Sequence, residues 1–442
     1  MASQAAVLSA PILRRYAQPV LLVMLVLAAR LAPDDWSPVR NLSNTPGRSF
    51  YHTLAVDPTT GDALVAWTDD GVATWEEVIG RRWDHTSQMW LGAENLSQSP
   101  EWARDGGPAL AFDGQGHGLL IWTRTYSTSQ GAPVSGHDVL WRVWDGAAWS
   151  PEQVLMHGEA YLPGSPGAFG LIPVQLPDAI LLFVTWGTGY RTAEYRDGAW
   201  TELAPWIYLS VSLDQVIAAP LRSRDGAVNL YATAYGPNSN QMGYNRWFHD
   251  AYYLAYDGTA WSEPVNLSNT DGVATSIGLA FDGQGGLHFL WSDPDSPYSD
   301  ESLKSAVWER VYDGATWTPN VEVTTYNDAQ AINGFSLTPG VGVTTTLSLA
   351  WSEGLIDGGT HIDLDIYYRS GDGTTWGPEH KVYTSTAESR YPVLVSGSGS
   401  IFLAWQEIFW AGGALPDSEV YASYQVDVIV PHAWIYLPVV PK

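Results

Sequence analysis

Short apolar runs separated by Asp/Gly turns recur along the chain. In Ile277–Asp293, two runs of leucine, isoleucine and aromatic residues flank the turn Asp-Gly-Gln-Gly, and Gly107–Arg124 is nearly its twin. Such pairs predict β-hairpins. A third run, as in Ser305–Gly314, leads to another Asp-Gly turn, and a fourth run starts at the tryptophan behind that turn. The pattern therefore predicts units of four short antiparallel strands.

The tryptophan behind the Asp-Gly turn marks each copy of this unit. The copies lie 51 to 61 residues apart, at Trp36, Trp90, Trp149, Trp200, Trp261, Trp317 and Trp376. Four-stranded antiparallel units repeated in this way are the blades of a β-propeller. We therefore expect an all-β, seven-bladed β-propeller with four antiparallel strands per blade. Its many tryptophans would fill the wedges between blades.

The two ends of the repeat complement each other. The chain enters the repeat with a lone fourth strand, Trp36–Ser43, and leaves it with strands one to three of a last unit, Tyr391–Val426. The N-terminal strand is expected to complete the last blade and close the ring, because an open array would leave bare strand edges. We place the propeller at residues 33–427. A two-domain β-sandwich protein is the alternative.

The composition disfavours nucleic-acid binding, and the N-terminal segment indicates export. The 442 residues include 47 acids, 21 bases and no cysteine, for a net charge of −26. In residues 1–32, Arg14 and Arg15 precede the apolar run Pro19–Ala29, which predicts a signal peptide or a retained N-terminal anchor. Residues 428–442 form a short apolar tail that cannot span a membrane. We expect a secreted or cell-surface monomer, membrane-held only if the N-terminal segment is kept.

One turn carries a resemblance to a known family. Ser370–Trp376, SGDGTTW, resembles the Asp-box (BNR) repeat of sialidase-like propellers, whose pattern is roughly S-x-D-x-G-x-T-W, although it lacks one residue between Asp and Gly. The resemblance implies a propeller whose active face is reached by the loops from fourth to first strands and from second to third strands. The Asp-Gly turns themselves are expected to be structural, since glycine accepts positive φ and aspartate caps its own backbone.

Three arginines stand before first strands on that face. Arg48, Arg104 and Arg390 come from inter-blade loops of the first, second and last blades, which become neighbours once the ring closes. Guanidinium groups bind carboxylates bidentately, so the three are candidates for a clamp on a substrate carboxylate. The alternative is that each arginine pairs with an acid in its own loop.

The same resemblance suggests candidate catalytic groups. A sialidase of this family uses a tyrosine nucleophile with a glutamate partner, and Tyr51 or Tyr391 with Glu388 could take these roles. The family's Phe-Arg-Ile-Pro stretch is absent, since Ala219–Arg222 does not match it. Whether the protein is an enzyme therefore stays open.

Tryptophans that precede an acid by two residues end several second strands. They are Trp67, Trp291 and Trp351, followed by Asp69, Asp293 and Glu353. Aromatic faces beside carboxylates suit sugar rings, which stack and form hydrogen bonds. The alternative is packing between blades with a solvated loop acid. The three Asn-Leu-Ser repeats, which start at Asn41, Asn95 and Asn266, fit an N-glycosylation pattern or one strand end used repeatedly.

Metal and cofactor signals are few. The acid-rich loops Asp293–Glu301 and Asp357–Asp365 make Ca²⁺ a possible ligand, although neither has EF-hand spacing. The histidines are scattered without zinc-site spacing, and no nucleotide-binding loop is readable. We expect no cofactor apart from this possible Ca²⁺.

Three functions fit these observations. The leading hypothesis is an exported propeller that binds a ligand, a glycan or else a surface protein, without catalysis. The first alternative is a sialidase-type glycoside hydrolase that uses the arginine clamp. The second is a structural or protein-interaction module of the cell surface.

Overall fold

The computed structural model describes residues 36–426 apart from 73–74, 101, 128–133, 159–168, 177, 219–228, 238–248, 259, 271–273, 275, 295–304, 325–329, 341–346, 358–360 and 411–415. The predicted N-terminal segment 1–32 and C-terminal tail 428–442 lie outside the described residues, as does most of the acid-rich loop Asp293–Glu301. Within the described part of the chain, no helix is long and apolar enough to cross a membrane.

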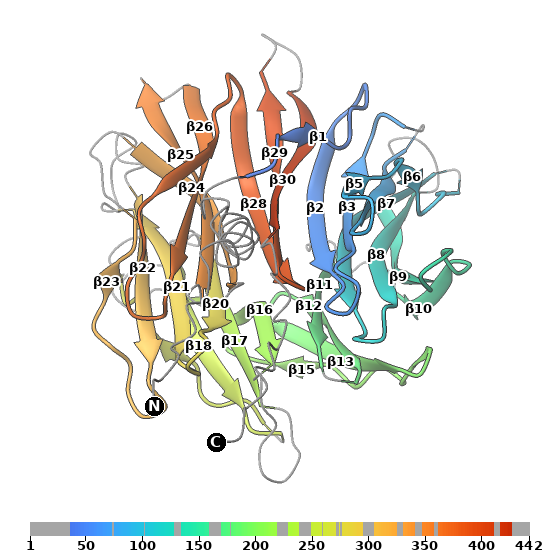
Figure 1. The fold of residues 1–442 in the computed structure, drawn as a ribbon. Helices are drawn as coiled ribbons and strands as arrows, with labels where there is room; N and C mark the ends of the chain where they lie inside the picture. Colours follow the sequence, from blue (N-terminus) through green and yellow to red (C-terminus); the bar gives the residue numbers. More distant parts are fainter. Residues whose placement is uncertain are drawn as a thin grey trace, which may run out of the picture.

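The structure confirms an all-β, seven-bladed propeller of antiparallel sheets (Figure 1). The first blade contains β2 (Ser49–Val56), β3 (Ala63–Asp69), β4 (Glu77–Asp84), β5 (Met89–Trp90) and β6 (Glu94–Asn95). The second contains β7 (Ala103–Phe112), β8 (Gly118–Ser127), β9 (Val134–Trp144) and β10 (Gln153–His157). The third contains β11 (Gly170–Gln175), β12 (Ile180–Trp186), β13 (Gly189–Arg196), β14 (Ala199–Trp200) and β15 (Ile207–Tyr208).

The remaining blades continue around the ring in sequence order. The fourth contains β16 (Ser212–Ala218), β17 (Leu230–Pro237), β18 (His249–Tyr256) and β19 (Val265–Asn266). The fifth contains β20 (Ile277–Phe281), β21 (Leu287–Pro294), β22 (Ser305–Tyr312) and β23 (Val321–Glu322). The sixth contains β24 (Gln330–Pro339), β25 (Leu347–Asp357), β26 (His361–Gly371) and β27 (His380–Tyr383). The seventh contains β28 (Glu388–Gly397), β29 (Ser400–Phe409), β30 (Asp417–Val426) and β1 (Arg40–Asn41).

The ring closes as the sequence predicts. β1 pairs antiparallel with β30, Arg40 opposite Ala422 and Asn41 opposite Tyr421, so the N-terminal strand completes the seventh blade. The inner strands β2, β7, β11, β16, β20, β24 and β28 each contact the next, and β28 contacts β2. Sequential blades therefore surround one central axis without a gap.

The anchor tryptophans occupy the wedges between blades. Each packs against the preceding blade: Trp36 on Tyr368, Trp90 on Phe402, Trp200 on Trp141, Trp261 on Phe183 and Trp317 on Tyr253, with ring centroids 5.0–6.2 Å apart. Trp149 packs against the first blade, and Trp376 donates its indole N–H to Glu309 of the fifth blade at 3.0 Å. Burying one large aromatic side chain stabilises the fold by roughly 1.5–3 kcal/mol, so the repeated tryptophan joins the blades.

The turns that define the repeat are structural. Asp145 accepts backbone N–H groups from Ala147 and Ala148 at 2.9 and 2.8 Å, while Gly146 takes a φ of 94°. Backbone donors of this kind lower the pKa of Asp372, because they favour the ionised form. The Asn-Leu-Ser ends also repeat one device: Asn41 accepts the N–H of Asn44, which has a φ of 46°. This geometry fits the interpretation that one strand end is used repeatedly.

Candidate functional site

Two inner strands carry an exposed tyrosine at a β-bulge. The register of β2 shifts between Phe50 and Thr53, and that of β28 shifts between Arg390 and Val393. Tyr51 and Tyr391 lie in these bulges with φ values of 51° and 55°, and 70% and 52% of their surfaces are exposed. Blades one and seven are neighbours in the closed ring, so the two tyrosines lie on adjoining strands at the same end of the axis.

A third aromatic residue with positive φ comes from the inter-blade loop before β7, which reaches the same face. Trp102, just before β7, has a φ of 66°, and its ring lies 5.3 Å from that of Trp75 in the loop between β3 and β4. Both tryptophans are half-buried. A bulky side chain rarely adopts positive φ, and among the described residues the three aromatic examples belong to blades seven, one and two.

The loops of these blades gather further aromatic side chains. Phe409 ends the second strand of blade seven and Trp410 follows it, and they are 37% and 55% exposed. We call the set Tyr51, Trp75, Trp102, Tyr391, Phe409 and Trp410 the aromatic face. Sequence reasoning selected only the tyrosines, and as catalytic groups. The adjacent aromatic pair Phe409–Trp410 at a predicted loop was the signal that could have identified the rest.

The arginines predicted as a clamp each pair with a different carboxylate. Arg48 contacts Asp70 at 2.7 Å, and Arg390 contacts Glu388 at 2.6 Å. Arg104 contacts Glu76 at 3.2 Å, and its guanidinium lies 5.5 Å from the centre of the Trp75 ring. The geometry thus matches the alternative of local ion pairs. Arg48 and Arg104 both bind acids of the loop between β3 and β4, so they fix that loop from its own blade and from the next.

The predicted tyrosine–glutamate pair does not form in the structure. Glu388 is buried and its carboxylate pairs with Arg390. Among the described residues, neither the Tyr51 nor the Tyr391 hydroxyl forms a hydrogen bond with a carboxylate. The structure therefore places Tyr51, Tyr391 and Glu388 on one face without arranging a nucleophile and its base.

The predicted sugar-stacking tryptophans are core residues in the structure. Trp67, Trp291 and Trp351 are 0–1% exposed, so no ring face is open to a ligand. Trp67 donates its indole N–H to Asp69 at 3.1 Å, and Trp351 donates to Glu353 at 2.6 Å. This matches the packing between blades of the alternative, but its solvated loop acid is wrong, since Asp69 and Glu353 are buried and accept the indole N–H. Burial raises the pKa of Glu353, although the hydrogen bond from Trp351 opposes the shift.

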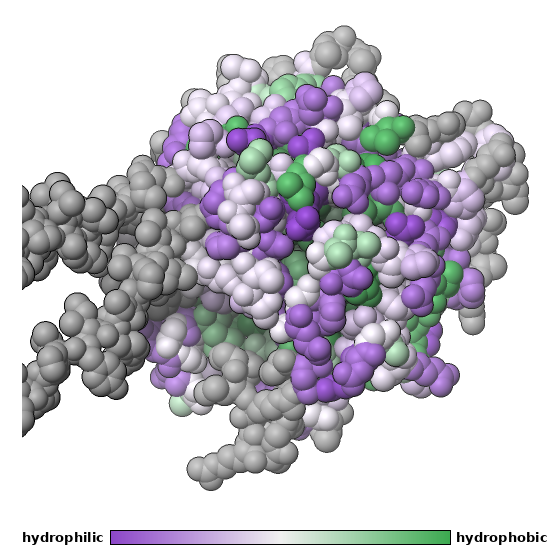
Figure 2. Space-filling model, turned by 45° about the vertical axis from the view of Figure 1, so that its right-hand side comes forward, coloured by the Kyte–Doolittle hydropathy of each residue, from purple (hydrophilic) through white to green (hydrophobic). Residues whose placement is uncertain are grey.

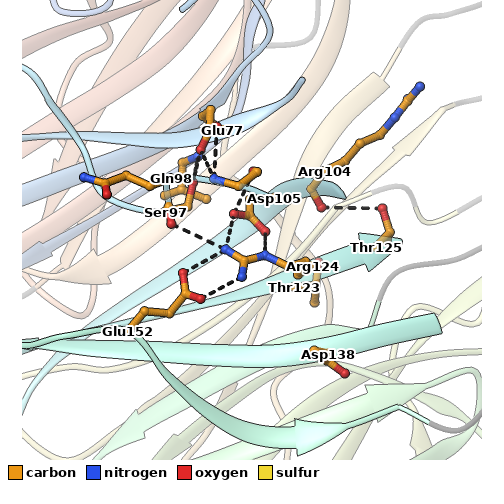
Figure 3. A network of polar contacts seen from close by, with 12 residues as sticks. Glu77, Ser97, Gln98, Arg104, Asp105, Thr123, Arg124, Thr125, Asp138 and Glu152 are labelled. Atoms are coloured by element: carbon orange, nitrogen blue, oxygen red, sulfur yellow. Dashed lines mark hydrogen bonds and ion pairs between the residues drawn. The ribbon is translucent and has the colours of Figure 1, made fainter. Parts of the chain in front are cut away.

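In blade two, the positively charged Arg124 occupies the strand position that the negatively charged Asp69 occupies in blade one. Asp69 pairs with Ser49 across the strands of blade one, whereas Arg124 pairs with Asp105 in blade two. The Arg124 Nε lies 2.6 Å from Asp105 and its Nη1 lies 2.6 Å from Glu152 (Figure 3). Figure 3 shows the Arg104 side chain pointing away from this network. Arg124 is 5% exposed and held by two carboxylates, so it is enclosed and its charge is already paired.

Metal ligands do not gather in the part of the chain that the structure describes. Across those residues, no group of three or more His, Asp or Glu side chains is arranged to hold an ion. Ca²⁺ binding stays a prediction, because parts of both acid-rich loops lie outside the described residues.

Comparisons with known proteins show the fold. No protein-family model matches the sequence, and no curated protein sequence matches it. Among solved structures, an ulvan lyase of polysaccharide lyase family PL25, bound to a GlcA–Rha3S unit, matches with a TM-score of 0.50, 11% identity and coverage of 87% of this chain and 95% of the lyase.

Two further structures match less closely. The NanB sialidase of Streptococcus pneumoniae has a TM-score of 0.47 and 10% identity, over 91% of this chain and 72% of the sialidase. A protein of unknown function from Dyadobacter fermentans has a TM-score of 0.46 and 13% identity, over 88% of this chain and 99% of its own. At these identities the similarity establishes the propeller fold alone.

Proposed function

We propose that this protein is an exported propeller that binds a glycan on the aromatic face without cleaving it. The observation that carries the proposal is the placement of Tyr51, Trp102 and Tyr391 at positive φ on neighbouring blades. A strained backbone persists only where surrounding structure fixes it, and such positions concentrate at functional sites. Here the fixed strain presents aromatic rings to solvent.

The chemistry of the aromatic face suits sugar rings. Aromatic side chains offer a flat apolar face for the C–H side of a sugar, and neighbouring polar groups can bond its hydroxyls. Arg104 is half-exposed beside Trp75 and can supply such a donor. The ulvan lyase with the same fold acts on a polysaccharide, which is consistent with a glycan ligand.

A protein ligand is less well supported. A stable protein partner usually needs a broad docking surface with an apolar centre. The side of the molecule brought forward in Figure 2 is largely hydrophilic, with hydrophobic residues in small separate patches. Separate aromatic side chains beside polar groups fit a carbohydrate chain better than they fit such a partner.

A hydrolase of sialidase type is disfavoured by the charges. Such an enzyme needs guanidinium groups that are available to a substrate carboxylate. Arg48 and Arg390 are instead bound to Asp70 and Glu388 at 2.7 and 2.6 Å, and a substrate would have to displace these pairs.

The test is a glycan-array screen followed by calorimetry on the strongest binder. Tyr51→Ala and Tyr391→Ala are each expected to weaken binding roughly tenfold, since an aromatic contact contributes about 1–1.5 kcal/mol. Tyr208→Ala is the matched control, because Tyr208 is 72% exposed on the outer strand β15 of the third blade and is not one of the aromatic-face residues. Release of sugar from a synthetic sialoside would contradict the non-catalytic part, and loss of binding only in Tyr208→Ala would contradict the site.

A further inference from the structure

Asp214 lies at a bulge that the sequence analysis did not select. The register of the inner strand β16 shifts between Leu213 and Gln215, which leaves Asp214 as the extra residue. The inner strands of blades one, two, six and seven have bulges at the same level, with four or five paired residues following in each strand. These bulges therefore form one layer around the axis.

Within that layer, Asp214 faces the two tyrosines. Blade four is three blades away from blade one in one direction and from blade seven in the other. It is therefore the blade opposite their junction in a ring of seven. Asp214 on β16 lies across the axis from Tyr51 on β2 and Tyr391 on β28.

The carboxyl group of Asp214 is unpaired, and the residue is exposed to solvent although protein surrounds its position. Among the described residues it has no hydrogen bond and no ion pair. Removal of bulk water by the surrounding protein raises its pKa to about 6. Such a group is unlike other acids of the first and last blades, since Asp69 and Glu407 accept hydrogen bonds and Glu388 forms an ion pair with Arg390.

No neighbouring strand supplies a counter-charge to Asp214. The strands packed against β16 are β11, β12, β17 and β20. Of these, β11, β12 and β20 contain no titratable residue, and β17 contributes Tyr231 and Tyr235. Burial and the charge of Asp214 raise the pKa of Tyr235, so Tyr235 stays neutral and supplies no positive charge to Asp214.

The electrostatics of this region select against acidic ligands. The whole chain has a net charge of −26. The arginines that enter this face, Arg48, Arg104 and Arg390, are each paired with an acid. A negative protein attracts cations into a channel with low-dielectric walls. The rings of Tyr51 and Tyr391 can also contact a cation through their π faces.

We propose that the axial layer binds the protonated amine of a cationic sugar, with Asp214 as its counter-ion and Tyr51 and Tyr391 on the opposite side. The amine site stands on the placement of Asp214, and only its assignment to a sugar rests on the proposed function. Binding requires an ionised Asp214 and a protonated amine. It is therefore strongest between pH 6, near the pKa of Asp214, and the pKa of the amine.

The experiment compares two oligosaccharides that differ only in this charge. Calorimetry at pH 7 measures binding of a glucosamine hexamer and an N-acetylglucosamine hexamer, with n-butylammonium as a sugar-free probe. A charge-assisted contact predicts that the amine hexamer binds roughly 10–100-fold more tightly. Asp214→Asn is expected to reduce this ratio to about one. Asp197→Asn is the control, because it removes the same charge from an exposed turn.

The outcomes separate the two proposals. Equal binding of both hexamers, with loss in Tyr51→Ala, keeps the glycan-binding function and overturns the amine site. Binding of n-butylammonium that disappears in Asp214→Asn, without binding of either hexamer, keeps the amine site and overturns the glycan function. An amine preference that survives in Asp214→Asn, or is lost equally in Asp197→Asn, also overturns the role of Asp214.

Discussion

Replacing Tyr51 and Tyr391 together with glycine is expected to stabilise the ring while it abolishes ligand binding. Both residues have positive φ, 51° and 55°, a conformation that glycine adopts freely. The equivalent bulges of blades two and six already contain glycines in this conformation, Gly107 and Gly334, with φ values of 61° and 90°. The backbone at this level of the ring therefore accepts glycine.

The magnitude follows from three terms. Relief of left-handed strain contributes about 1.5 kcal/mol at each tyrosine. Glycine costs about 0.75 kcal/mol at each position, because the unfolded chain gains freedom. Tyr51 also gives up an edge contact with Phe50, whose ring centroid is 5.1 Å away, worth about 0.5 kcal/mol. The net gain is about 1 kcal/mol, since both side chains are largely exposed.

Thermal melting of the double variant and of a control measures this gain. For a ring of this size, 1 kcal/mol raises the melting midpoint by roughly 1–2 °C. Tyr208→Gly, at an exposed position where no positive φ occurs, is expected to lower the midpoint instead. If the double variant melts below the wild type by as much as the control does, the strain argument is refuted.

Three further predictions concern the core. Arg124→Met leaves Asp105 buried without its partner and is expected to cost about 3–5 kcal/mol in urea unfolding, whereas adding Asp105→Ser should recover much of the loss. His288 lies 2.7 Å from Glu309 and 3.1 Å from a second carboxylate, which outweigh burial and raise its pKa. The stability from this contact should therefore be present at acidic pH and fall as pH rises through the raised pKa, and melts at pH 5–9 should show no such fall in His288→Gln. Leu42→Ala removes a fully buried side chain beside β1 and should cost about 2–5 kcal/mol, with faster hydrogen exchange in β30 as the sign that closure is weakened.

The sequence was sufficient to predict the fold because the repeat reports local structure. The Asp-Gly turn and the tryptophan behind it depend on a few adjacent residues, and their spacing directly gives the number of blades. The pairing of β1 with β30 followed from counting strands at the two ends. These inferences needed no knowledge of which side chains meet in space.

The site was less predictable because it depends on register and on neighbouring blades. The burial of Trp67 is decided by the blade packed against it. The residues around a tryptophan at a strand end therefore do not tell whether its ring is exposed or buried. Arg104 pairs with Glu76 of another blade, a partner 28 residues earlier in the chain. The bulge at Asp214 exists only relative to the register of β17 and leaves no mark in local composition.

Ring closure also sets the order in which this protein can be completed. Arg40 pairs with Ala422, so the closing strand is made early and waits while 381 intervening residues are synthesised. From the synthesis of β30 until β1 pairs with it, β30 presents an unpaired edge, and the equivalent strand of a second molecule fits it equally well. Exchange of that strand between two copies would join them without any new interface chemistry. The pairing of β1 with β30, which closes one propeller, is thus also the pairing through which two incompletely folded chains can become linked during biosynthesis.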